Sequence, residues 1–357
     1  MSPGFYLRGK VVNFNRSICL AISAAFSTAL ASAGTIDYTC NANIGAATCT
    51  HLNTTIAALY SGTFSNANAD IYIQYGTTGL GSSSQFQNFV TYSTYLNALT
   101  AENGPGAIRA SAIASLPGTE PALYKSGDIN VTTALAAALG ITTDAFGNPI
   151  TGTTVGGITC TTVGSGGCYD AVITLTNSPN TFYNRIGAQP AGTYDLYSTV
   201  EHETDEVLGT SSCVDTNGPS LANGCGAPNA SAVDLFRYSG KGNRVFESTT
   251  PGAYFSYDGG TTNGADGFAY NTLSNGEDYA DFVSICPAGP LSVQDAEGCP
   301  DTSGLDITND GGAEINILDA VGYNLNPTVT GVPEPAALCL FGAGFVVLGW
   351  YRLRRSA

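Results

Sequence analysis

The residues best suited to chemistry lie between Glu201 and Glu206, in the segment EHETDE. His202 and Glu206 are four residues apart, so on a helix they project from one face, one turn apart, with Glu203 beside them. An imidazole and a carboxylate at this spacing can hold one metal ion, and an adjacent carboxylate can act on water that the ion polarises. The alternative is an acidic helix face that only meets solvent. The chain has two histidines in all, and this scarcity favours the metal site.

The element that must position these side chains is a predicted helix over residues 193–209. Thr193 is expected to cap its start, and Gly209 to end it in the left-handed conformation. Apolar side chains recur at helical spacing at Tyr197, Val200, Val207 and Leu208.

This segment resembles the metal-binding helix of zinc metalloproteases, whose motif is His-Glu-x-x-His, often followed by x-x-Gly. Residues 202–209 read HETDEVLG, with Glu206 in place of the second histidine. The resemblance implies that His202 and Glu206 are metal ligands and that Glu203 is the general base. It also implies an α+β fold of the zincin-like type, in which a small twisted sheet covers the active-site helix.

The third ligand is not at its usual position. Ser212 stands where the metzincin group carries a third histidine, and serine is a poor zinc ligand. We expect Asp234 to take this role, with Asp215 as the alternative, because both follow the helix and carboxylates can bind zinc. Zinc is the expected ion, although one imidazole with two carboxylates also suits manganese or calcium.

Two groups of acids occur later in the chain. The second group begins like a calcium-binding loop, but Ile317 stands where such a loop needs a glutamate. Structural calcium is therefore kept as an alternative role for these acids. The groups are Glu277, Asp278 and Asp281 in GEDYADF, and Asp306, Asp310 and Glu314 in DITNDGGAE.

The first 33 residues have the pattern of a secretory signal peptide. Arg8, Lys10 and Arg16 precede an apolar run, and Ala31-Ser32-Ala33 offers a small-residue cleavage site. The body is expected to begin near Gly34.

The last residues combine three features in order. Pro333, Glu334 and Pro335 close a linker over residues 327–335, an apolar membrane segment follows over 336–351, and a basic tail occupies 352–357. This arrangement resembles the PEP-CTERM sorting signal of Gram-negative bacteria. The resemblance implies recognition by an exosortase, and the arginines of the tail should remain cytoplasmic. We therefore expect export through the inner membrane, transient anchoring with the body outside, and a final place at the cell surface or in the extracellular polysaccharide matrix.

The charge of the body is strongly negative. Between Gly34 and Val332 there are six basic residues against 27 acidic ones. Such a body repels nucleic acid, so no nucleic-acid partner is expected, whereas divalent cations are compatible with it.

The eight cysteines of the body fall into close neighbours along the chain. Local bridges are expected in an oxidising compartment, although sequence alone leaves the connectivity open. The expected pairs are Cys40/Cys49, Cys160/Cys168, Cys213/Cys225 and Cys286/Cys299.

Residues 34–326 are expected to form one loop-rich, disulfide-stapled domain, with an upper part over 34–209 and a lower part over 210–326. Alternating or continuous apolar residues predict strands over 69–75 and 169–176. The Gly/Ser-rich stretch 79–84 is interpreted as a turn, and residues 86–99 as a helix. Blocks between residues 190 and 326, among them DLFRYSGKGNR and NILDAVGYN, resemble exported PEP-CTERM proteins classed as metalloproteases.

Three functions are compatible with these observations. The leading hypothesis is an exported metal-dependent peptidase that acts on a peptide or protein substrate. The alternative is a non-catalytic surface or matrix protein on a degenerate zincin-like scaffold. A carbohydrate-binding module is a third hypothesis, to which the 19 tyrosines are suited.

Overall fold

The computed structural model describes residues 34–327 apart from 103, 105, 120, 122–126, 216–217, 220–224, 226–228, 273–276, 285 and 287–290. The predicted signal peptide and the sorting segments over residues 328–357 lie outside the described residues. Within the described part of the chain, no helix is long and apolar enough to cross a membrane.

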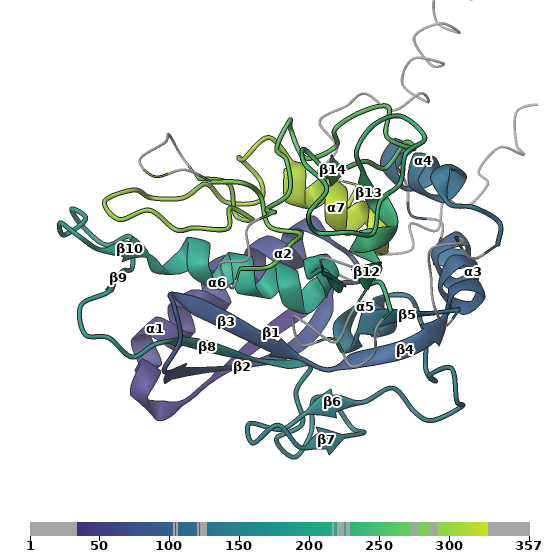
Figure 1. Ribbon diagram of the computed structural model, residues 1–357. Helices are drawn as coiled ribbons and strands as arrows, with labels where there is room; N and C mark the ends of the chain where they lie inside the picture. The colour runs from purple at the N-terminus through teal and green to yellow at the C-terminus, as the bar shows by residue number, and fades with distance from the viewer. Residues whose placement is uncertain are drawn as a thin grey trace, which may run out of the picture. The chain divides into compact units, whose positions relative to one another are not determined.

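A four-stranded sheet forms the framework of the described chain, in the order β1-β2-β8-β3 (Figure 1). Its strands are β1 (Thr35–Cys40), β2 (Asn68–Gly76), β8 (Ala171–Thr176) and β3 (Gly81–Gln85). β1, β2 and β8 run parallel, whereas β3 pairs antiparallel with β8 and forms an edge of the sheet. The apolar run of β8 is almost wholly buried, as expected for a strand covered on both faces.

The helices are distributed along the whole described chain. They are α1 (Ala46–Leu52), a π-helical segment (Asn53–Ala57), α2 (Ala58–Thr63), α3 (Tyr92–Glu102), α4 (Ala107–Ser115), α5 (Thr133–Ala138), α6 (Leu196–Asp205), a π-helical turn (Glu206–Thr210) and α7 (Ala313–Val321). Short 3-10 helices occupy Ala42–Ile44 and Val233–Phe236.

The remaining strands pair in twos. β4 (Gln87–Thr91) pairs with β5 (Asp128–Thr132), and the others are short: β6 (Gly152–Thr153) with β7 (Thr159–Cys160), β9 (Phe182–Tyr183) with β10 (Tyr194–Asp195), β11 (Val214–Asp215) with β12 (Gly218–Pro219), and β13 (Arg237–Tyr238) with β14 (Tyr254–Phe255).

Helix α6 lies against the sheet, where it packs on β3 and β8 (Figure 1). Two buried tyrosines tie it to the N-terminal elements. The Tyr60 hydroxyl of α2 donates to Asp205 Oδ1 at 2.6 Å, and the Tyr38 hydroxyl of β1 lies 2.7 Å from Thr204 Oγ1. The helix is thus fixed by side chains that are themselves in the core.

The sequence-based elements need three corrections. Stretch 79–84 is not only a turn, because Gly81–Gln85 is strand β3. Residues 86–99 are not one helix, because β4 precedes α3. The cap of α6 is Asp195 rather than Thr193, since its carboxylate accepts from the backbone of Tyr197 at 2.9 Å.

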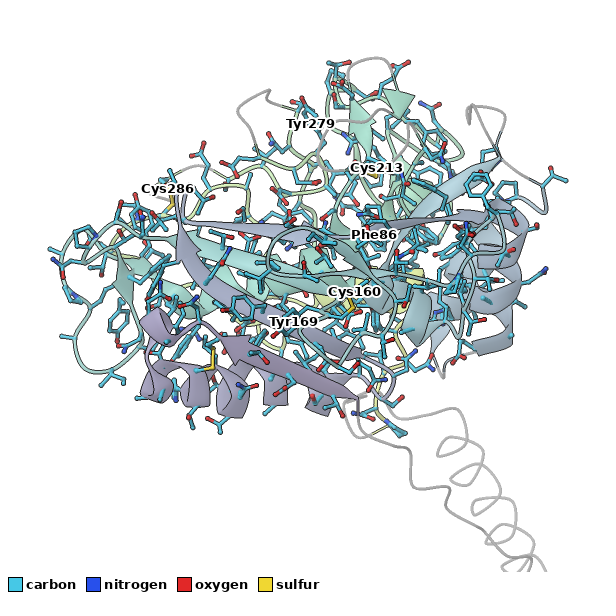
Figure 2. All side chains as sticks on the ribbon, turned by 90° about the horizontal axis from the view of Figure 1, so that it is seen from below. Phe86, Cys160, Tyr169, Cys213, Tyr279 and Cys286 are labelled. Atoms are coloured by element: carbon cyan, nitrogen blue, oxygen red, sulfur yellow. A yellow bond between two sulfur atoms is a disulfide. The ribbon has the colours of Figure 1, made fainter. Side chains whose placement is uncertain are left out.

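Four disulfides join the expected neighbours, and their sulfurs are yellow in Figure 2. The pairs are Cys40–Cys49, Cys160–Cys168, Cys213–Cys225 and Cys286–Cys299. Each bridge closes a loop of 8 to 13 residues. The predicted local connectivity is confirmed.

Candidate metal centre

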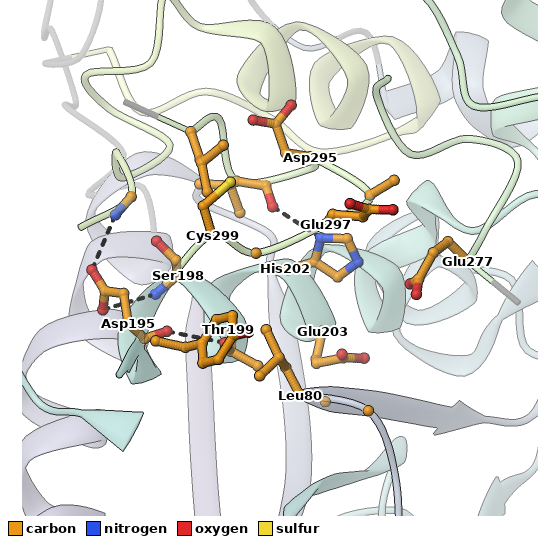
Figure 3. Close-up of a pocket in the computed structure, with 18 of the residues that line it drawn as sticks. Leu80, Asp195, Ser198, Thr199, His202, Glu203, Glu277, Asp295, Glu297 and Cys299 are labelled. Carbon is orange, nitrogen blue, oxygen red and sulfur yellow. Dashed lines mark hydrogen bonds between the residues drawn. The ribbon is translucent and has the colours of Figure 1, made fainter. Parts of the chain in front are cut away.

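The imidazole of His202 projects from α6 into a cavity of about 600 Å³ (Figure 3). Its Nδ1 lies 2.9 Å from the carbonyl oxygen of Val293, a contact that requires a proton on Nδ1. Nε2 is then the nitrogen with a free lone pair. A metal-binding histidine is oriented in this way, because the second ring nitrogen donates to a fixed acceptor.

Two carboxylates face that nitrogen. Glu206 Oε1 lies 3.9 Å from His202 Nε2, and Asp281 Oδ1 lies 3.7 Å from it. One potential ligand atom from each of the three residues lies within 4.8 Å of the others. Donors about 2.1 Å from a shared tetrahedral ion lie about 3.4 Å apart. The distances of 3.7 and 3.9 Å between the imidazole and the two carboxylates are slightly wider than such an ion needs.

The protein holds the other oxygen of each carboxylate. Ser83 of β3 donates its hydroxyl hydrogen to Glu206 Oε2, which leaves Oε1 toward the imidazole. The backbone N–H of Asp278 donates to Asp281 Oδ2 at 3.0 Å. Asp281 Oδ1 is buried and has no hydrogen-bond partner among the described residues. Each side chain therefore keeps one atom for the protein and presents the other to a common point.

The turn that presents Asp281 is itself anchored. The Asp278 carboxylate accepts from the backbone N–H groups of Ser212 and Ala280, at 2.9 and 2.6 Å. Arg237, which is 1% exposed, donates to the carbonyl of Tyr279 at 2.7 Å. The Ser212 contact connects the turn to the segment that leaves α6, and Arg237 connects it to β13.

Glu203 is on the same helix and lines the same cavity. It is 5% exposed, and its Oε2 has no hydrogen-bond partner in the described part of the chain. Burial raises the pKa of Glu203 well above its usual range, and the nearby carboxylate of Glu206 adds to this shift. Burial also raises the pKa of Asp281, with the Asp278 charge as the next cause.

The two aspartates expected as third ligands are placed elsewhere. Asp234 accepts hydrogen bonds from Ser212 Oγ, the Cys213 N–H and both the N–H and Oγ of Ser231, at 2.5 to 2.9 Å. Its oxygens are thus committed to backbone and hydroxyl groups of Ser212, Cys213 and Ser231. Asp215 lies in the short strand β11. Neither belongs to the group around His202 among the described residues.

The acidic group in GEDYADF contributes Asp281 instead. The sequence shows this group as a cluster of acids, which is a signal for cation binding. It does not show that the fold brings Asp281 next to His202. The second acidic group lies apart from the His202 centre. Asp306 forms an ion pair with Arg185 at 2.5 Å, and Glu314 accepts a hydrogen bond from the Gln294 N–H at 2.9 Å.

Residues 331–355 match the family described as the PEP-CTERM protein-sorting motif. Comparison with curated proteins and with solved structures gave no match. Motifs of this kind are recognised by exosortases, in agreement with the expected processing partner. The prediction made from Pro333, Glu334 and Pro335 is confirmed: the chain is exported, held by its C-terminal segment with the body outside, and then processed.

Proposed function

We propose that the chain is an exported metal-dependent peptidase whose ion is held by His202, Glu206 and Asp281. The observation that carries the proposal is the convergence of Nε2 of the imidazole with one oxygen of each carboxylate, at 3.7 and 3.9 Å. The opposite atom of each side chain is engaged by the protein. A solvated acidic helix face would not require such fixed orientations.

The donors fit a divalent cation. Asp281 is 1% exposed, yet the oxygen that faces His202 has no hydrogen-bond partner among the described residues. A buried carboxylate oxygen without a partner is costly, and a cation at the common point would offset that cost. One nitrogen and two carboxylates suit zinc, and they also suit manganese or calcium.

The proposed reaction is the hydrolysis of a peptide bond. When bound, the ion would act as a Lewis acid that polarises the carbonyl of the substrate and acidifies water. In the proposed reaction the charge of the bound cation would lower the raised pKa of Glu203. The ionised Glu203 would then accept a proton from the attacking water and pass it to the nitrogen of the leaving amine. The cavity beside Glu203 offers room for the substrate.

The proposal includes a zincin-like arrangement of the body. Support comes from the sheet β1-β2-β8-β3, which lies against α6 through β3 and β8. The exported location agrees with a peptidase that acts outside the cell on a peptide or protein, with the polysaccharide matrix as its surroundings.

The experiment compares wild type with Glu203→Gln. Elemental analysis of the dialysed proteins should find about one zinc ion per chain in both, because Glu203 is not a ligand. Casein hydrolysis should fall by about 10²- to 10⁴-fold in the variant, since it loses the proton acceptor. Glu247→Gln, which removes an exposed acid outside the cavity, should retain full activity.

The opposite results are equally informative. A wild-type chain that retains no ion and leaves casein intact would point to a non-catalytic surface or matrix protein. A chain that binds calcium alone would lead to the same conclusion. Equal hydrolysis by wild type and Glu203→Gln would remove Glu203 from the mechanism.

A further inference from the structure

Gln294 is buried behind the proposed metal centre, where its polar groups bond to several parts of it. The residue is 1% exposed. It directly follows Val293, whose carbonyl oxygen lies 2.9 Å from His202 Nδ1. Gln294 is not among the residues that line the cavity beside His202, so any effect it has on a bound ion is exerted through its neighbours.

The side-chain amide of Gln294 bonds to both ends of the helical stretch that carries two of the ligands. Its Nε2 donates to the carbonyl oxygen of His202 at 3.2 Å, and its Oε1 accepts from the Thr210 hydroxyl at 3.1 Å. The His202 carbonyl also accepts from the backbone N–H of Glu206, and Thr210 ends the π-helical turn that begins at Glu206. One side chain therefore spans the helical stretch from the first ligand to beyond the second.

The backbone of Gln294 is bonded to the third ligand's turn and to helix α7. Its carbonyl accepts from the N–H of Phe282 at 2.7 Å, and Phe282 directly follows Asp281. Its N–H donates to Oε1 of Glu314, a buried residue in the first turn of α7, at 2.9 Å. The same residue is thus bonded to the parts of the chain that place all three ligands.

An amide is the side chain that these surroundings require. The carbonyl of His202 can only accept a hydrogen bond, so the NH₂ group of Gln294 must face it, and the Thr210 hydroxyl can then donate to the amide oxygen. A carboxylate of the same length would lack the donor, and an apolar side chain would lack both partners. Because the site is buried, water would not replace the lost bonds easily.

We propose that Gln294 is a positioning residue of the metal centre, which holds the imidazole and both carboxylates so that their ligand atoms converge. Groups that orient metal ligands in this way commonly change metal affinity without contacting the ion. The inference rests on the proposed function in one respect, since it takes His202, Glu206 and Asp281 as the ligands.

The test measures zinc affinity, by competition with a fluorescent zinc chelator, and does not depend on activity. Gln294→Met keeps the length of the side chain and removes both of its hydrogen bonds. We expect it to bind zinc about 10- to 100-fold more weakly than wild type. Gln87→Met is the matched control, because Gln87 is also buried but lies in β4 and does not line the cavity. It should bind zinc as wild type does.

A second readout separates positioning from stability. Cobalt(II) in place of zinc has visible absorption bands that report the geometry of its ligands, and these bands should change in Gln294→Met but not in Gln87→Met. Urea denaturation of the metal-free proteins measures the stability that each variant loses. A lower urea midpoint in Gln294→Met, with unchanged zinc affinity and cobalt spectrum of the folded chain, would overturn the inference.

Thr210→Val is a milder change at the same contact and decides the question if Gln294→Met does not fold. It keeps the branched side chain and removes only the hydroxyl that donates to Gln294 Oε1. Zinc binding should weaken by about two- to tenfold, the equivalent of one hydrogen bond. Unchanged zinc affinity in this variant would also contradict the role of Gln294.

The two proposals fail in different ways. Weaker zinc binding by Gln294→Met, together with no casein hydrolysis by zinc-loaded wild type, would support the inference and contradict the peptidase. Unchanged zinc affinity in the folded variants, with an active wild type, would overturn the inference and leave the peptidase in place. A wild-type chain that binds no zinc would overturn both.

Discussion

At the residue scale, the proposed centre depends on how polar atoms are shared. His202 gives Nδ1 to the Val293 carbonyl, Glu206 gives one oxygen to Ser83, and Asp281 gives one oxygen to the backbone. A side chain held at one polar atom has few rotamers left, so the other atom is aimed without further entropic cost. This is the feature that separates these acids from the exposed acids of the surface.

Two aspartates offer a direct comparison of ligand and structural roles. Asp281→Asn should lose the ion, because the neutral amide presents a weaker donor to the common point. Asp234→Asn should keep the ion but reduce the free energy of unfolding by about 1–3 kcal/mol, since four hydrogen bonds from Ser212, Cys213 and Ser231 end on its carboxylate. Elemental analysis and urea denaturation measure the two effects. Loss of the ion in Asp234→Asn alone would reverse the assignment.

Sequence reasoning found the part of the centre that is local. His202, Glu203 and Glu206 could be grouped because a helix fixes the relation between positions three and four apart. Asp281 could not, because its approach to α6 depends on a turn anchored by Asp278. Asp234 is the ligand expected from its position after the helix. In the structure its carboxylate instead accepts hydrogen bonds from the backbone N–H groups of Cys213 and Ser231.

At the element scale, the helical segment that starts with α6 carries two of the three proposed ligands, and strand β3 supports one of them. The Asp195 carboxylate caps α6, in a place where negative charge is favoured by the helix dipole. β3 brings Ser83 to Glu206. The composition of β3, Gly and Ser with one Gln, is typical of a turn. Its antiparallel pairing with β8 makes the segment a strand instead. The sequence therefore predicted the apolar strands β2 and β8 but not this polar edge strand.

Gly209 ends the helical segment in a conformation that favours glycine, with φ of 116°. A Cβ there would lie 3.2 Å from Leu135 Cδ2 of α5. Gly209→Ala should therefore lower the free energy of unfolding by about 1–3 kcal/mol. Gly62 provides the matched control, because it lies in α2 and a Cβ there would meet no atom within 4 Å.

Gly62→Ala should raise the free energy of unfolding by about 0.5–1 kcal/mol, since alanine has the higher helix propensity. Urea denaturation of the two variants beside wild type measures both changes. An unchanged urea midpoint in Gly209→Ala would mean that residue 209 can adopt a conformation open to alanine. The direction of the chain from Ser211 onward would then need another explanation.

At the scale of the whole molecule, the described chain buries many carboxylates with few basic partners. Burial raises the pKa of Asp170 and Asp295 to about 7, and that of Asp310 and Asp319 to about 6. Between about pH 4 and pH 7 the folded state therefore binds more protons than the unfolded chain. The stability carried by these groups is present at low pH and is lost as the pH rises through 6 to 7.

The chain freed of metal by a chelator should accordingly have a higher Tm at pH 5 than at pH 8. Thermal denaturation followed by circular dichroism measures the difference. Asp170→Asn should weaken the pH dependence, because its amide stays neutral throughout while its oxygen can still accept from the Asp70 N–H. A Tm that falls steadily from pH 8 to pH 5 would show that these carboxylates are charged in the folded state.

The carbonyl that orients His202 belongs to Val293, which lies in the loop closed by Cys286 and Cys299. Thiols stay reduced in the cytoplasm and form bridges after export. A newly made chain would then lack the staple around the residue that aligns its imidazole. If the chain is the peptidase proposed above, it would be latent until it left the cytoplasm, and the cell that synthesises it would be protected from its activity.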